Sequence, residues 1–151
     1  MTLTTGLRHD HDVIRTKLTV LEELLALSHH PETIRPLCHS LMRFLDGHMC
    51  KEEQTLAPYA HRIQQCMKQR TFRDHAEQRV VLRDLNALFA QGIKIPVSLS
   101  VGHLSHLIDE LREHMSEEEQ GVFPVIDHAE ELMLEQRHAA SAEAPTIGGT
   151  R

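Results

Sequence analysis

Aromatic side chains are scarce in this chain of 151 residues, which contains no tryptophan, one tyrosine and four phenylalanines. The core is therefore expected to be aliphatic, with leucine as its main residue. Long apolar runs are also missing. Because a membrane helix needs about 18 or more consecutive apolar residues, no membrane span is predicted.

Basic residues are outnumbered, since 16 lysines and arginines against 22 acidic residues give a formal net charge of −6 with histidine neutral. A nucleic-acid backbone is held by a basic face, so no nucleic-acid partner is expected. The three cysteines include no Cys-x-x-Cys pair and are too few for a disulfide framework. Residues 1–8 lack the apolar stretch of a secretory signal, so a reducing, cytoplasmic location is expected.

Histidine is abundant, with 13 positions in the chain and no oligohistidine run that would indicate a tag. Histidine is the commonest metal ligand and the side chain that titrates near neutral pH. Its abundance is therefore typical of a metal site or a pH sensor, and the positions of the histidines relative to the core decide between them.

Apolar residues recur at three- and four-residue spacings almost throughout, which predicts helices and no strands. Helices are predicted over residues 5–28, 32–57, 64–91, 97–123 and 125–138, followed by a disordered tail over 139–151. Pro36 is expected in the first turn of the second helix, Pro58 at its end, and Pro124 as an interruption of the fourth. Short connections make neighbouring helices antiparallel. The expected fold is all-α, an up-down-up-down four-helix bundle with a short fifth helix, in one domain over residues 1–138.

An internal repeat relates the two halves of the chain. Residues 48–58 (HMCKEEQTLAP) align with residues 114–124 (HMSEEEQGVFP) at an offset of 66, and six of the eleven positions are identical. The chain therefore reads as two helix pairs that carry the same chemistry.

Polar side chains interrupt the apolar stripe of each helix at the same depth. Because residues three or four apart share a helix face, six of them are expected to point into the bundle: His11, His48, Glu52, His75, His114 and Glu118. Burying these groups among leucines is unfavourable unless each has a partner, and metal ions satisfy imidazoles and carboxylates together. The pattern predicts two metals, of iron, manganese or zinc. His11 and His48 would hold one, His75 and His114 the other, and Glu52 and Glu118 would bridge them.

A single His-x-x-x-Glu spacing is common on solvated helices, and His106 with Glu110 has this spacing off the apolar stripe. That pair is predicted to be exposed. Glu53 and Glu119 are expected to be solvated or to supply an extra ligand. A purely structural bundle with adventitious metal is the remaining interpretation, and the buried carboxylates argue against it.

The pattern resembles the hemerythrin-like family, also called the HHE cation-binding domain, over about residues 7–127. The resemblance is carried by His11-x-x-Ile14, by the two His-x-x-x-Glu motifs with their following prolines, and by Asp74-His75. It implies a bundle that holds two non-haem iron ions bridged by carboxylates and by an oxo or hydroxo group. It also implies chemistry with dioxygen, peroxide, nitric oxide or iron itself.

The chain departs from the oxygen-carrying hemerythrins one turn after His75. Those proteins have a second histidine there, whereas this chain has Arg79. The resemblance then implies four protein ligands per iron and an open position, which favours reactivity, sensing or iron exchange over oxygen carriage. A guanidinium cannot ligate iron. Arg79 is therefore expected either to act catalytically, by donating to a carboxylate ligand or to a bound anionic oxygen species, or to extend out of the bundle.

Two functions follow from these interpretations. The first is a di-iron protein that binds or reacts with dioxygen, peroxide or nitric oxide, as a binder or as an oxidase- or peroxidase-type enzyme. The second is an iron-storing or iron-sensing module without catalysis. A ferritin-like oxidase is disfavoured because it needs two Glu-x-x-His motifs on core faces, and only Glu135-x-x-His138 occurs. The oligomeric state is left open.

Overall fold

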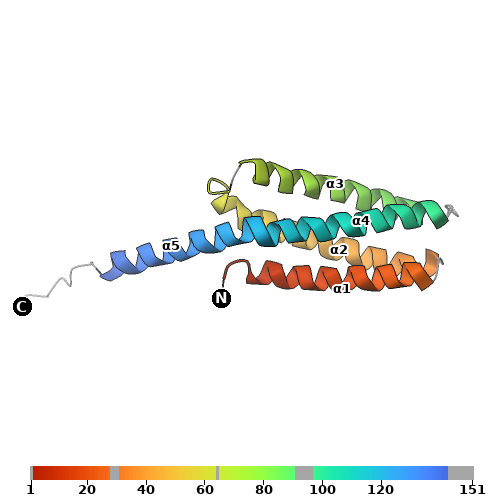
Figure 1. Cartoon of the computed structure of the whole chain (residues 1–151), viewed down its shortest axis with the longest axis horizontal. Helices are drawn as coiled ribbons and strands as arrows, with labels where there is room; N and C mark the ends of the chain where they lie inside the picture. Colours follow the sequence, from red (N-terminus) through yellow and green to blue (C-terminus); the bar gives the residue numbers. More distant parts are fainter. Residues whose placement is uncertain (1, 28–30, 64, 91–96, 143–151) are drawn as a thin grey trace, which may run out of the picture.

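The computed structural model describes residues 2–27, 31–63, 65–90 and 97–142, which contain helices and no strand. Four helices, α1 (Thr5–Leu27), α2 (Pro31–Leu56), α3 (Gln65–Ala90) and α4 (Val97–Glu117), lie side by side, each antiparallel to the one before (Figure 1). The predicted four-helix bundle is confirmed. The predicted helix-end residues 28, 64 and 91 and the tail residues 143–151 lie outside the described residues.

One proline begins α2, a second lies within it and a third follows its end. The helix begins at Pro31, where a missing amide proton has no cost because the first helical amides have no intrahelical partner. Pro36 therefore lies in the second turn rather than in the predicted first turn. After Leu56 the chain forms a 3-10 turn, η1 (Ala57–Tyr59), and the prediction that Pro58 ends the helix is confirmed.

The prediction that Pro124 interrupts the fourth helix is wrong. α4 continues through a π-helical turn, η2 (Glu118–Val122), into α5 (Phe123–Ala142), and together they form one long rod (Figure 1). In the π turn the amide of Phe123 donates to the carbonyl of Glu118, five residues back. The wider turn accommodates the proline ring, which would clash with a carbonyl in a regular α-helix. α5 also continues past the predicted end at residue 138, so residues 139–142 are helical rather than disordered.

Two apolar clusters fill the bundle, and a polar layer separates them. The larger cluster contains Ile14 and Leu18 of α1 together with residues of α2, α3 and α4. The smaller cluster lies where α5 leaves the bundle and contains Leu7, Leu56, Ile63, Val122, Phe123 and Ile126. On α1 the buried stripe passes from Leu7 through His11 to Ile14, and so crosses from one cluster to the other at a histidine. The candidate site is therefore enclosed by aliphatic side chains on both sides.

The buried face of α3 is more polar than predicted. Phe72, which lies three residues before His75 and is therefore expected on the same face of the helix, is 37% exposed, whereas its neighbour Thr71 is buried. Gln78 is buried as well, so polar side chains flank His75 on both sides. Leu85 and Phe89, whose spacing also predicts a place on the apolar stripe of this helix, have side chains outside the described part of the structure.

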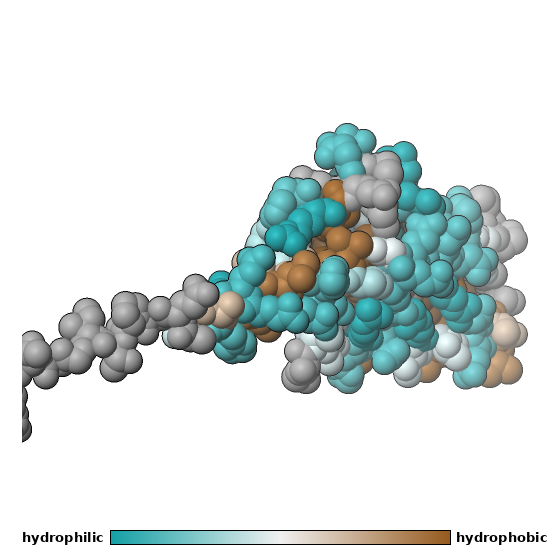
Figure 2. Space-filling view, turned by 60° about the vertical axis from the view of Figure 1, so that its left-hand side comes forward, coloured by the Kyte–Doolittle hydropathy of each residue, from teal (hydrophilic) through white to brown (hydrophobic). Residues whose placement is uncertain are grey.

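The visible surface is mostly polar, and a group of apolar residues lies where α5 leaves the bundle (Figure 2). α5 carries four exposed large hydrophobic residues: Val125, Leu132, Met133 and Leu134. Among the residues that the structure describes, no helix combines the length and the hydropathy needed to cross a membrane.

Candidate metal centre

The structure brings the six predicted side chains together in the polar layer, and none is more than 8% exposed: His11, His48, Glu52, His75, His114 and Glu118. They form two groups of four that share both glutamates. One group adds His11 and His48, and the other adds His75 and His114; in each, one ligand atom per residue lies within 4.8 Å of the others. These are the pairs proposed from the sequence, and their role as ligands stays a prediction.

Each glutamate faces histidines of both groups. Glu52 Oε2 lies 3.5 Å from Nε2 of both His48 and His75. Glu118 lies with Oε1 2.8 Å from Nε2 of His114 and with Oε2 3.5 Å from Nε2 of His11. A carboxylate between two sets of imidazoles is suited to bridging two cations.

The least satisfied polar atoms of the site belong to the two glutamates. None of the four carboxylate oxygens of Glu52 and Glu118 has a hydrogen-bond partner in the described part of the chain, although both residues are at most 2% exposed. Nε2 of His114 is also without a hydrogen bond, despite its short approach to Glu118. Buried polar atoms are nearly always satisfied, because leaving one unpaired costs about 1–3 kcal/mol. Nitrogen and oxygen atoms that are buried together without hydrogen bonds fit two metal ions of the iron, manganese or zinc type.

Burial and neighbouring charges move the pKa values of these groups in opposite directions. Burial lowers the pKa of His48 to about 4 and raises the pKa of Glu52 to about 7. Burial also disfavours the charged form of His75, but the adjacent carboxylates of Glu118 and Glu52 outweigh it and raise its pKa to about 10. The metal-free centre therefore holds protons near neutral pH that a metal ion must displace.

Two outer carboxylates hold the histidines contributed by α1 and α3. Nδ1 of His11 lies 2.8 Å from Glu119 Oε1, and Nδ1 of His75 lies 3.1 Å from Glu53 Oε1. Glu53 and Glu119, each about a quarter exposed, are thus hydrogen-bonded to these histidines. A carboxylate on the far nitrogen orients the ring and leaves Nε2 free for a metal.

The histidines of α2 and α4 have aspartates in the same place. Nδ1 of His48 lies 3.6 Å from Asp10 Oδ2, and Nδ1 of His114 lies 3.4 Å from Asp74 Oδ2. Sequence reasoning did not identify Asp10. The sequence pattern that could have identified Asp10 is an Asp-His dipeptide that occurs twice, at residues 10–11 and 74–75, each time with the buried histidine in second place.

Arg79 contacts the centre only through Glu53. Its Nη1 donates to Glu53 Oε1 at 2.9 Å and its Nε donates to Asp46 Oδ1 at 3.4 Å, with the side chain 35% exposed. Arg79 therefore donates to Glu53, the carboxylate that is hydrogen-bonded to His75, rather than to Glu52 or Glu118. Its catalytic role stays a prediction.

Arg15 occupies the equivalent place on α1, and sequence reasoning missed it. Its Nη2 lies 2.9 Å from Glu119 Oε1, the atom that also meets His11. The signal is a His-x-x-x-Arg spacing that occurs at residues 11–15 and again at residues 75–79, an offset of 64. The inner and outer residues of the centre thus follow the two-fold repeat of the chain.

His106 and Glu110 show what the same spacing does off the core face. Their side chains are 75% and 51% exposed and lie 3.2 Å apart. The prediction that this pair is exposed is confirmed, which shows that spacing gains meaning only from its place on the buried stripe.

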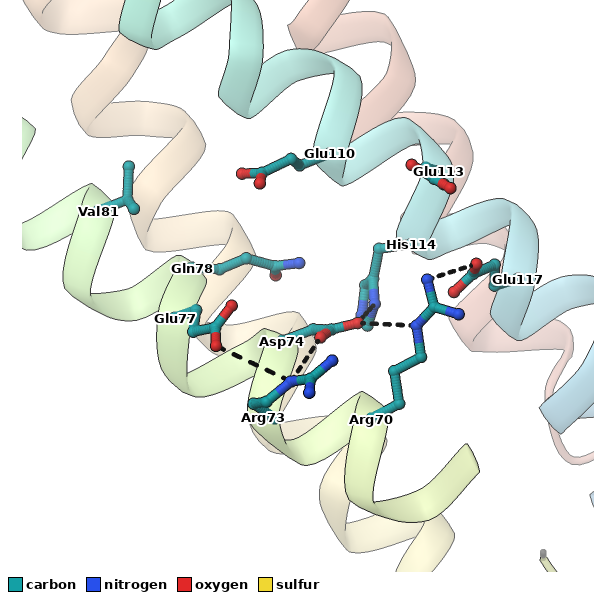
Figure 3. Close-up of a pocket in the computed structure, with 10 residues that line it drawn as sticks. All are labelled: Arg70, Arg73, Asp74, Glu77, Gln78, Val81, Glu110, Glu113, His114 and Glu117. Carbon is teal, nitrogen blue, oxygen red and sulfur yellow. Dashed lines mark ion pairs between the residues drawn. The ribbon is translucent and has the colours of Figure 1, made fainter. Parts of the chain in front are cut away.

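A cavity of about 230 Å³ lies between α3 and α4 and is lined at its inner side by His114 (Figure 3). Arg70 reaches across it from α3, with Nη2 2.8 Å from Glu117 Oε1. A second cavity of about 320 Å³ shares Arg70, Asp74, His114 and Glu117 with the first and is also lined by Glu118. The centre therefore has openings beside it on the α3–α4 side.

Two His-x-x-x-Glu pairs in a four-helix bundle, with both glutamates shared by the two groups of potential ligands, define a class of helical cation-binding domains. The family model for the Hemerythrin HHE cation binding domain matches residues 2–126, and the chain belongs to this family. No curated protein and no solved structure gives a significant match to the chain. The match to the family model confirms the resemblance inferred from the motifs.

Proposed function

We propose that this chain holds two non-haem iron ions, bridged by Glu52, Glu118 and an oxo or hydroxo group, and that it binds or reacts with dioxygen, peroxide or nitric oxide. The observation that carries the proposal is the set of four buried carboxylate oxygens without hydrogen bonds, surrounded by four histidines, among the residues that the structure describes. Membership in a cation-binding family supports it.

In this proposal His11 and His48 hold one ion, and His75 and His114 hold the other. When bound, iron supplies redox chemistry toward small oxygen- or nitrogen-containing molecules. Four protein ligands per ion leave coordination positions for an exogenous molecule, which is the feature that separates reactive from purely structural metal sites.

The surrounding residues prepare the donors for that role. Glu53 and Glu119 are hydrogen-bonded to Nδ1 of His75 and His11, which orients the two rings so that their Nε2 atoms face the centre. Leu7 and Ile14, both at most 1% exposed, limit the access of water on the α1 side. A dry site strengthens every electrostatic interaction within it.

An iron-storing or iron-sensing module is the second candidate, and one observation favours it. The cavities between α3 and α4 are lined by His114 and Glu118, so two proposed ligands lie beside an opening. Such an opening suits exchange of the ion as well as entry of a small molecule.

Metal analysis and optical spectra of the purified protein test the proposal. We expect two iron ions per chain and absorption bands that change on reduction and on exposure to oxygen. Bands restored by each exposure to oxygen indicate a binder, consumption of added peroxide indicates an enzyme, and loss of iron in each cycle indicates storage or sensing. Fewer than two bound metals, or a spectrum insensitive to reduction, contradicts the proposal.

A further inference from the structure

The two-fold repeat makes the α1–α2 face and the α3–α4 face comparable residue by residue. Offsets of 64 between α1 and α3, and of 66 between α2 and α4, superimpose the histidines and carboxylates of the two halves. The residues around this shared arrangement differ between the faces. They show which side of the centre is closed and which side is open.

On the α1–α2 face, lysines and apolar groups cover the centre. Lys51 Nζ lies 2.7 Å from Asp10 Oδ2 and packs over Gly6, where an added Cβ would meet it at 3.3 Å. Lys17 Nζ lies over the Phe44 ring, 5.8 Å from its centroid. This side therefore presents positive charge, and α1 packs more closely against α2 than α3 does against α4.

On the α3–α4 face, the equivalents of Phe44 and Lys51 are Glu110 and Glu117. The first cavity, of about 230 Å³, is lined by ten residues (Figure 3). Five of them are acidic and two are arginines, which gives a formal charge of −3 with histidine neutral. Glu113 makes no ion pair with any residue in the described part of the chain, and Glu110 pairs only with the exposed His106. This side therefore presents negative charge over an opening.

Proposed ligands stand at the inner end of that opening. His114 lines both cavities, and Glu118 lines the second. Both are more than nine-tenths buried, and Nε2 of His114 and both oxygens of Glu118 lack hydrogen bonds within the described residues. Unpaired donors at the end of an acidic opening match the chemistry of a divalent cation.

We propose that the α3–α4 opening is the entry route for divalent metal ions, with Glu110 and Glu113 as its acidic mouth and His114 as the first ligand that an ion meets. The inference rests on the proposed metal centre. A mouth lined by charge of one sign raises the local concentration of the opposite ion and speeds its capture, and salt weakens the effect. Dioxygen and nitric oxide are uncharged, so this charge pattern gives them no advantage.

Arg70 limits the route. Its guanidinium bridges α3 and α4 through Glu117, 2.8 Å away, and lies 3.9 Å from Asp74. The side chain is 54% exposed, and exposed ion pairs are weak, so it can swing aside. Removing its charge is expected to speed the uptake of cations.

Uptake of Co²⁺ by the metal-free protein, followed by absorption in a stopped-flow instrument, tests the route without any activity. We expect Glu110→Gln/Glu113→Gln to slow uptake about three- to tenfold at low salt. Glu110→Lys/Glu113→Lys should slow it further and make the rate rise, rather than fall, with salt. Arg70→Gln should accelerate it. All variants should still bind two Co²⁺ per chain at equilibrium.

The matched control is Glu23→Gln/Glu135→Gln, which makes the same change in net charge at exposed positions away from the opening. If Glu110→Gln/Glu113→Gln takes up Co²⁺ at the rate of this control and with the same salt dependence, the route is wrong. A wild-type stoichiometry below two contradicts the proposed function itself, and the route with it.

Discussion

Arg15 and Arg79 occupy equivalent positions in the two halves of the bundle, one turn after His11 and His75. Each guanidinium lies 2.9 Å from the carboxylate oxygen that also meets the histidine Nδ1, in Glu119 for Arg15 and in Glu53 for Arg79. Each arginine therefore pins the carboxylate that orients an imidazole. The arrangement extends the two-fold pattern of the centre to its outer boundary.

Replacing either arginine should loosen the centre without emptying it. We expect Arg15→Ala and Arg79→Ala each to weaken metal affinity about two- to tenfold, because outer partners of metal-binding histidines tune affinity through ring orientation. The stoichiometry should remain two, and the melting temperature of the metal-free protein should change little. Competition with a chelator measures the affinity. Arg83→Ala, which removes an exposed arginine paired with Asp84, is the control. Affinity equal to that of the control would show that the arginines position nothing.

Histidine and glutamate variants should differ in how many metals they lose. Loss of His48 or His114 should remove or weaken one metal, whereas loss of Glu52 or Glu118 should affect both, because each carboxylate faces both histidine pairs. His106→Ala is the control, since it breaks a pair of the same spacing at the surface. Metal analysis of the alanine variants gives the count. Two metals retained in a chain that lacks both glutamates would contradict the bridging role.

Metal removal should destabilise the protein, and removal of the buried carboxylates should reverse part of that loss. Ligands that bind only the folded state raise the free energy of unfolding, so a chelator should lower the melting temperature. In the metal-free protein, Glu52→Leu/Glu118→Leu should raise the free energy of unfolding by about 1–4 kcal/mol, because it replaces buried carboxylates that lack hydrogen bonds by apolar packing. Thermal unfolding with and without iron measures both effects. A metal-free double variant less stable than the metal-free wild type would refute this expectation.

Metal affinity should rise with pH between about 5.5 and 8. The pKa of Glu52 is raised to about 7 and that of His75 to about 10, so both groups carry protons over much of this range in the metal-free protein. Metal binding must release these protons, and a higher pH therefore favours the bound state. Calorimetric titrations in buffers of different ionisation enthalpy measure the protons released. Affinity that is independent of pH would mean that these two groups do not bind the metal.

Much of the inner centre was predictable from the sequence because it follows from helical geometry. Residues three or four apart share a face, so His48 and Glu52, like His114 and Glu118, had to lie on one side of their helices. The apolar stripe on either side then indicated that this face is buried, which separated these pairs from His106 and Glu110. The repeat at an offset of 66 linked the two halves through the order of residues alone.

Contacts between helices were decided by the tertiary structure. The pairing of Glu119 with His11 spans 108 positions along the chain and depends on how α1 packs against the π turn after α4. The π turn could not be predicted from the local sequence. A proline such as Pro124, after a stretch that contains glutamate and glycine, predicts a break in the helix rather than a wider helical turn. Likewise, no local pattern shows that the α3–α4 side is open and the α1–α2 side closed. Helix periodicity determines which way a residue points along its own axis, whereas the spacing and rotation of neighbouring helices depend on the packing of the whole core.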